Sequence, residues 1–403
     1  MGLFSRLLAL RLFEAHSIQR WNDRIRSVDL TEMDKQAFKS VLTYFFAKLE
    51  EEKGEEINWE YLVYGSLFAL LKNVALSDIK APVIRKIKTE YHDAFKELNG
   101  WVVEQYHPII EDKELLSEFE RFMNSDDDES NINLRILRAA HKFSTLREFE
   151  IIKAANSSFP QLSDLEKEVR QGVERYKDLE GVQQMLLEGS FFEGICLIEQ
   201  LRFQTRWSQT PRIPKTTVLG HCMLVACLMV FLSRQLDACS SRLCNNFYAG
   251  LFHDLPEAVV RDIISPVKRA TAQLPAIIKK IEVEVCESEL YPKFPEYVVN
   301  HLKYLLGNGT EFADRIMANG APRPLTENEN INDYNHDEYS PVDGKLLKVC
   351  DEIVAFIEAD QSIKHGVTSR HLQDGMANIR SKYIQNKKPI SGIDVQRFFL
   401  EFD

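Results

Sequence analysis

The chain contains two similar segments, which suggests that its fold is duplicated. The segment at 64–85, YGSLFALLKNVALSDIKAPVIR, is identical to the segment at 248–269, YAGLFHDLPEAVVRDIISPVKR, at nine of 22 positions. An Arg-Trp pair precedes each segment, at 20–21 and at 206–207. Chance similarity between helical segments is the alternative, but the matching motifs keep their order along the chain. We therefore expect two related domains.

The hydrophobic pattern is helical in both halves. Apolar residues recur at three- and four-residue steps in stretches such as VLGHCMLVACLMVFLSRQL and DGKLLKVCDEIVAFIEADQSI, and no convincing alternating strand is present. A chain of 403 residues has ample length to bury a core in each half. The expected fold class is all-α, with two tandem helical bundles at 1–187 and 188–403.

The second half has an insertion near 305–345. The offset between matching motifs rises from 184 to 210 along the chain, so the second copy gains about 26 residues (210 − 184). The inserted sequence is rich in Gly, Asn, Pro and Asp and is predicted to be largely loop. Long loops are often lids or binding loops, and disorder without a function is the alternative.

The second half also carries a scattered set of metal-ligand residue types. His221, His253, Asp254 and Asp351 combine two imidazoles with two carboxylates, which suit a catalytic divalent transition metal. Glu257 lies three residues past Asp254, about one helical turn on, so it can face the same site. A lone histidine such as His221 on an apolar helix is more often a hydrogen-bonded core residue. Together, however, these groups are the parts of a metal-dependent hydrolase.

This ordered set resembles the ligand set of the HD-domain metal phosphohydrolases. HDLPEAVVRDIISPVK looks like the HDxxE…D…PxK segment of the bacterial HD-domain 5′-deoxynucleotidases, and an Arg-Trp pair begins 15 residues before His221. The resemblance covers roughly 188–403. It implies an HD domain whose single divalent metal ion is held by His221, His253, Asp254 and Asp351. The ion could be Mn²⁺, Co²⁺, Zn²⁺, Fe²⁺ or Mg²⁺.

The resemblance also implies catalytic roles for two acidic residues. Glu257 is expected to act as a general base or to orient the water. Asp262 would serve the active site as well, although Asp78 stands at the matching position of the first copy and favours a structural part. Arg261 stands where the family commonly has glycine.

Substrate binding is assigned by the same resemblance to Arg206, Trp207 and Lys268. Arg206 and Lys268 would hold the phosphate, and Trp207 would pack on the sugar near its 2′ position. Lys268 is replaced by Ile84 in the first copy, which favours a functional cation. The Arg-Trp pair persists in the first copy, so a structural role for it is the alternative.

The first copy has lost the candidate ligands. Its residues at the positions of His221, His253, Asp254, Glu257 and Asp351 are, in that order, about Gln36, then Ala69, Leu70, Asn73 and His141. Alanine and leucine cannot ligate a metal. We therefore expect residues 1–187 to form a degenerate HD-like domain with a scaffold or regulatory role.

Composition places limits on partners and location. The net charge of −11 argues against a nucleic-acid-binding surface. The seven cysteines form no CxxC pair, which favours free thiols in a reducing cytoplasm. Arg6 and Arg11 interrupt the apolar N-terminus, unlike a secretory signal, and no stretch is expected to span a membrane.

The sequence thus favours metal-dependent removal of phosphate from a small-molecule nucleotide, with a deoxynucleoside 5′-monophosphate as the favoured substrate. A phosphodiesterase or triphosphohydrolase acting on another nucleotide is one alternative. A nucleotide-sensing or interaction module that does not catalyse is another. We expect the two copies to form an intrachain pseudo-dimer, a homo-oligomer being left open, with no nucleic-acid or membrane partner.

Overall fold

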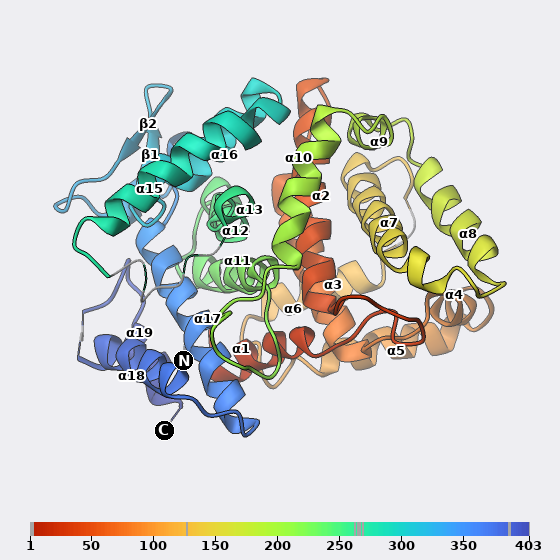
Figure 1. Ribbon diagram of the computed structural model, residues 1–403, viewed down its shortest axis with the longest axis horizontal. Helices are drawn as coiled ribbons and strands as arrows, with labels where there is room; N and C mark the ends of the chain where they lie inside the picture. Colours follow the sequence, from red (N-terminus) through yellow and green to blue (C-terminus); the bar gives the residue numbers. More distant parts are fainter. Residues whose placement is uncertain are drawn as a thin grey trace. The chain divides into compact units, whose positions relative to one another are not determined.

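The computed structural model describes residues 4–125, 128–261, 263, 267, 270–385 and 388–402. The chain divides into two compact units, Met1–Val182 and Gln183–Asp403. Helices make up nearly all of the regular structure in both units (Figure 1). The predicted all-α class is therefore confirmed. Asp262 and Lys268, two of the predicted site residues, lie outside the described residues.

The first unit is a bundle in which α2, α3 and α7 pack on one another (Figure 1). Polar side chains cap these helices: Thr31, Asn58 and Asn131 each accept a hydrogen bond from a backbone N–H of the first turn. The elements are α1 (Arg6–Phe13), η1 (Glu14–His16), α2 (Glu32–Glu52), α3 (Trp59–Leu76), α4 (Ala81–Glu90), α5 (His92–Glu104), α6 (Lys113–Met123), α7 (Ile132–Lys153), η2 (Ala154–Asn156) and α8 (Leu162–Glu174). Helix α9 (Glu180–Leu186) crosses the boundary between the units.

The second unit is built around α11, α12 and α17. Its helices are α10 (Ser190–Glu199), η3 (Gln200–Arg202), α11 (Val218–Gln235), α12 (Ser240–Phe252), α13 (Glu257–Val260), α15 (Leu274–Val285), the π-helical turn η4 (Cys286–Leu290), η5 (Tyr291–Lys293), α16 (Glu296–Leu306), η6 (Gly307–Gly309), η7 (Ile331–Tyr334), η8 (Asp337–Tyr339), α17 (Gly344–Lys364), α18 (Arg370–Gln385) and α19 (Val395–Leu400). A Cβ on Gly250 of α12 would lie 2.7 Å from Cα of Ala226, so the missing side chain allows α12 to approach α11 closely.

The insertion near 305–345 contains a β-hairpin that the sequence analysis did not expect. Strand β1 (Arg315–Ala318) pairs antiparallel with β2 (Ala321–Pro324). The turn residues Asn319 and Gly320 have φ of 53° and 76°, as a tight two-residue hairpin turn requires. A buried ion pair between Arg242 and Asp343, with two N···O distances of 2.7 Å, fixes the end of the insertion to α12.

Helix α11 contradicts the expectation that no stretch is long and apolar enough to span a membrane, although no span is thereby shown. By length and composition α11 is apolar enough to cross a membrane, and 89% of this 18-residue window is buried inside the protein. The bent pair formed by α3 and α4 passes the same test only if it is counted as one broken span. The apolar side chains of α11 face protein on nearly all sides, as in the core helix of a large bundle.

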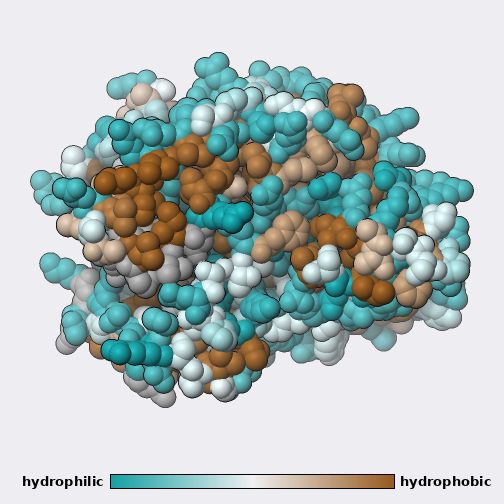
Figure 2. All heavy atoms as spheres, in the orientation of Figure 1, coloured by the Kyte–Doolittle hydropathy of each residue, from teal (hydrophilic) through white to brown (hydrophobic). Residues whose placement is uncertain are grey.

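Not every apolar side chain is covered. Ile277 and Ile281, one turn apart on α15, are 49% and 46% exposed. Figure 2 shows hydrophobic surface over this part of the second unit.

The seven cysteines are free, and five of them are buried, which agrees with the expected free thiols.

Candidate metal centre

Four structural segments of the second unit carry the predicted ligands. His221 lies in the first turn of α11, four residues after Thr217, whose side chain caps the helix. His253 is the C-terminal cap of α12, and Asp254 follows in the turn before α13. Asp351 lies in α17. Residues far apart in the sequence are therefore brought together by the packing of α11 against α12 and α17.

Three of the predicted ligands form a compact group. The nearest ligand atoms of His221, His253 and Asp254 all lie within 4.8 Å of one another, and the two imidazole centroids are 5.5 Å apart. Asp351 joins them through His221, because its Oδ1 lies 3.2 Å from His221 Nε2. Ligand atoms about 2 Å from a shared ion have mutual separations of this size. His221, His253 and Asp254 could therefore hold a single divalent ion, and Asp351, the fourth predicted ligand, lies beside His221.

The second nitrogen of His253 explains how its ring is oriented. His253 Nδ1 lies 2.8 Å from the carbonyl oxygen of Gly250, so Nδ1 carries the proton and donates it. The Nε2 atom is buried and makes no hydrogen bond to any described residue. It lies 3.4 Å from Asp254 Oδ2. A buried nitrogen lone pair beside a carboxylate is costly alone and is satisfied by a metal ion.

Positive charge surrounds the two candidate carboxylate ligands. Burial raises the pKa of Asp351, but Lys348, at 2.9 Å from its Oδ2, and His221 together hold that pKa well below its usual range. For Asp254, burial is likewise outweighed by His253 and Arg206, which lower its pKa. Both side chains are therefore ionised, which is the form that binds a metal.

Glu358 is a central residue of this site that the sequence analysis missed. Its carboxylate is fully buried on α17, seven residues after Asp351. It accepts hydrogen bonds from Trp207 Nε1 at 2.9 Å and from Thr216 Oγ1 at 2.8 Å. Its Oε1 also lies 3.5 Å from His221 Nδ1, the nitrogen on the side away from Asp351. Glu358 therefore helps to orient the His221 ring through its Nδ1 side, while Nε2 faces the other candidate ligands. Carboxylates commonly do this for metal-binding histidines.

Arg206 is held between two carboxylates. Its Nη1 donates to Asp254 Oδ2 at 3.2 Å, and its Nε lies 3.5 Å from Glu358 Oε2. Burial opposes the charge, but Glu358 and Asp254 raise the pKa of Arg206 above its usual value. Arg206 thus positions a candidate metal ligand. Because a guanidinium has five N–H groups, these two contacts leave others for a substrate anion.

Trp207 has a structural role in addition to its predicted one. Its backbone has φ of 56°, in the left-handed region that is uncommon for a tryptophan. The guanidinium of Arg212 lies 6.0 Å from its ring centroid, and a Cβ on Gly375 would lie 2.9 Å from its outer ring edge. The side chain is therefore packed by its neighbours and oriented by Glu358.

Glu257 lies close to the ligand group. It is the first residue of α13, is 5% exposed, and its backbone N–H donates to the Asp254 carbonyl at 3.0 Å. Gln204 Nε2 donates to its carbonyl oxygen at 2.9 Å. Arg261, at the end of α13, has φ of 64°, which explains why glycine would suit this position.

The first unit reproduces the buried carboxylate but not the ligands. Trp21 has φ of 54°, and its Nε1 donates to Glu148 Oε2 at 2.9 Å, while Arg20 Nε lies 3.1 Å from the same oxygen. Four residues after the cap Thr31, where the second unit has His221, the first unit has Lys35. Its ammonium lies 3.8 Å from Glu148 Oε2. A lysine therefore occupies this position, one residue earlier than the approximate sequence alignment suggested.

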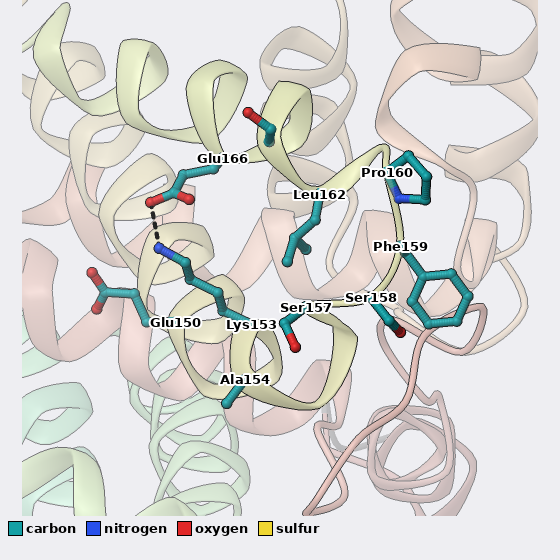
Figure 3. A pocket seen from close by; sticks show the side chains of 10 residues that line it. Glu150, Lys153, Ala154, Ser157, Ser158, Phe159, Pro160, Leu162 and Glu166 are labelled. Atoms are coloured by element: carbon teal, nitrogen blue, oxygen red, sulfur yellow. Dashed lines mark hydrogen bonds and ion pairs between the residues drawn. The ribbon is translucent and has the colours of Figure 1, made fainter.

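A separate hollow in the first unit has a different character. It measures about 620 Å³ and lies where η2 leads into α8 (Figure 3). Lys153 and Glu166 form an ion pair of 2.8 Å at its edge (Figure 3). Its other lining residues are Glu150, Ala154, Ser157, Ser158, Phe159, Pro160, Leu162 and Ser163. This set contains two glutamates, Glu150 and Glu166, but no imidazole.

Comparison with known proteins agrees with the geometry of the second unit. Residues 198–380 match the family model described as an HD domain. This segment is therefore similar to an HD domain. HD domains are in general metal-dependent phosphohydrolases, so the hydrolase and metal-binding expectations are supported at that level. No curated protein and no solved structure matches the chain significantly.

Proposed function

We propose that the HD domain of the second unit hydrolyses the phosphate monoester of a nucleotide, with a deoxynucleoside 5′-monophosphate as the favoured substrate. The observation that carries this proposal is the convergence of His221, His253, Asp254 and Asp351, with Glu257 beside them. The four ligands would hold one divalent ion. When bound, such an ion polarises the phosphate and lowers the pKa of a water molecule.

The residues of the chain would supply the remaining steps. Glu257 takes a proton from the attacking water while the oxygen of that water forms a bond to phosphorus. The phosphorus–oxygen ester bond breaks, and the released alcohol of the nucleoside receives the proton. Arg206 keeps Asp254 in place and offers its remaining N–H groups to the phosphate. Lys268 is proposed as a second cation for the phosphate.

The substrate assignment rests on the resemblance and on Trp207. A tryptophan oriented by Glu358 next to the ligand group offers a flat surface for a sugar. A 2′-hydroxyl would crowd that surface, which would favour deoxyribose. The two alternative reactions differ in their products, because a triphosphohydrolase releases a chain of three phosphates and a phosphodiesterase releases a nucleotide.

The test is a product assay on the full-length protein. A panel of ribo- and deoxyribonucleoside mono- and triphosphates and cyclic nucleotides is incubated with Mn²⁺, Co²⁺, Mg²⁺ or EDTA, and products are separated by chromatography. We expect inorganic phosphate from deoxynucleoside 5′-monophosphates and none with EDTA. Turnover that persists in EDTA, or the absence of turnover with every metal, would refute the proposal.

We further infer that the first unit is a degenerate copy of the HD domain. Three features that recur in both units support a duplication. Each unit has an isolated backbone bridge, Gln19–Thr31 in the first and Thr205–Thr217 in the second. Each also has a tryptophan with left-handed φ, Trp21 or Trp207, whose indole donates to a buried glutamate on α7 or α17. The lost ligands imply that this copy does not hydrolyse phosphate esters.

A further inference from the structure

The first unit gathers basic side chains where α2, α3 and α7 pack together. Lys35 and Lys39 lie one turn apart on α2, Lys72 lies on α3, and His141 and Lys142 lie on α7. The corresponding region of the second unit gathers carboxylates and imidazoles instead. The two units therefore present opposite charge in comparable places.

Lys35 is neutralised within the protein. Its Nζ lies 3.8 Å from Glu148 Oε2 and donates to Thr145 Oγ1 at 2.6 Å. Arg20 forms an ion pair with Glu32, to which its Nη1 donates a hydrogen bond of 2.8 Å. Its Nε also donates to Glu148. These two carboxylates are thus fully engaged by two cations. Glu32 also acts on Lys39 from a distance, through Gln36, but makes no direct ion pair with it.

Lys39 carries a buried ammonium that makes no direct ion pair within the described part of the chain. It is 6% exposed, and its ammonium donates to the amide oxygen of Gln36 over a long 3.4 Å. Within the described part of the chain, no carboxylate oxygen lies within 4.0 Å of the ammonium of Lys39, Lys72 or Lys142. Burying an ammonium without a paired anion costs free energy that an anion would recover.

The lowered proton affinities in this cluster agree with an excess of positive charge. Burial lowers the pKa of Lys39 to about 8, Lys72 adding to the effect against the opposing pull of Glu32. The imidazole of His141 lies close enough to Lys35 and Lys39 to interact with their positive charges. Lys39 still carries its charge at neutral pH, so the cluster is cationic.

Part of the cluster is exposed to solvent. His141 is exposed, and Lys72 and Lys142 are partly exposed. Ala69 and Leu70 stand in place of a histidine and an aspartate and carry no charge, and the nearby carboxylate of Glu32 is paired with Arg20. A divalent cation would be repelled by three lysines, whereas a phosphate dianion would find two or three ammonium donors.

We propose that the first unit binds a phosphate-bearing anion at Lys39 and Lys72, with His141 at its solvent side. The ligand class is a phosphate dianion, either inorganic phosphate or the phosphate group of a nucleotide. The degenerate unit is then an anion-binding effector site. This proposal goes beyond the proposed function and does not depend on catalysis by the second unit.

The experiment is isothermal titration calorimetry on the full-length protein in EDTA, so that no divalent metal contributes. Inorganic phosphate, a deoxynucleoside monophosphate and a nucleoside triphosphate are titrated separately. We expect one site per chain that is weakened at least tenfold in Lys39→Gln and in Lys72→Gln. Binding of phosphate itself would identify a phosphate site, and binding of the nucleotides alone would identify a nucleotide site. Both results support the proposal.

The matched control is Lys167→Gln, which removes an exposed lysine on α8 of the same unit and should leave binding unchanged. Lys39→Arg keeps the charge and should restore part of the affinity lost in Lys39→Gln. Lys72 is only partly buried, so its substitution tests the site without risk to the core. Unchanged affinity in both glutamine variants, or no binding of any of the three anions at millimolar concentration, would overturn the proposal.

Discussion

The indole Nε1 of Trp207 donates a 2.9 Å hydrogen bond to Glu358 and thereby fixes the loop before α11 to α17. Trp21 and Glu148 make a bond of the same length in the first unit. In the second unit the carboxylate also faces His221 and Arg206, so one buried charge orients both a candidate ligand and the cation beside Asp254. In the first unit the same charge is met by Lys35 and Arg20 instead.

Replacing this carboxylate should weaken metal binding without removing a ligand. Glu358→Gln keeps the size of the side chain but loses the charge that Arg206 and Arg212 stabilise. We expect affinity for the divalent ion to fall by about 10- to 100-fold, the usual effect of losing a group that orients a ligand. Competition with a metal chelator measures it. Glu148→Gln is the matched control and should leave the metal affinity of the protein unchanged.

Glu257 should matter for the reaction more than for the metal. Glu257→Gln is expected to retain the ion and to lower kcat by roughly 10²- to 10⁴-fold, as loss of a general base does. Steady-state phosphate release and elemental analysis measure the two effects. Glu282→Gln, which alters another buried glutamate whose partner Lys279 lies 3.2 Å away, should leave kcat unchanged. A kcat equal to that of the parent would disprove the role of Glu257.

The metal should belong to the second unit alone. We expect one divalent ion per full-length chain, and none in the double variant His253→Ala/Asp254→Ala, because that variant removes two of the four proposed ligands. Inductively coupled plasma mass spectrometry after dialysis counts the ions. His141→Ala in the first unit should retain the full amount. A stoichiometric ion remaining in the double variant would show that the first unit binds metal.

Lys39 should make stability depend on alkaline pH. Burial lowers its folded-state pKa to about 8 from the usual 10.5, so between these values the unfolded chain binds more protons. The free energy of unfolding therefore rises with pH across this window, by roughly 3 kcal/mol at most. Lys39→Met should be more stable than the parent at pH 7 and should lose this rise.

Urea unfolding of parent and Lys39→Met at several pH values from 7 to 10.5, without phosphate, checks this expectation. Lys167→Met serves as the control, because it removes an ammonium that is exposed on α8 rather than buried in the core. Parallel pH profiles for the parent and Lys39→Met would show that Lys39 carries no desolvation cost.

The sequence by itself determined the helices and the candidate ligand types. Three- and four-residue apolar spacing is a local property, and threonines at 31 and 217 cap their helices through contacts within one turn. His253 and Asp254 could be selected because they are adjacent polar residues after an apolar run. The hairpin was also available locally, since Asn319-Gly320 is a common turn pair, but the surrounding Gly- and Pro-rich sequence favoured a loop.

Only the tertiary structure decided which charged side chains lie next to one another and which are buried. Glu358 lies in a stretch with ordinary helical spacing, and its partner Trp207 is 151 residues away, so no local pattern marks it as part of the site. The same holds for Lys39, which looks like a surface lysine in the sequence but is buried on α2. Burial and long-range pairing arise when helices pack, because they depend on side chains that are distant in the chain and on the water that packing excludes.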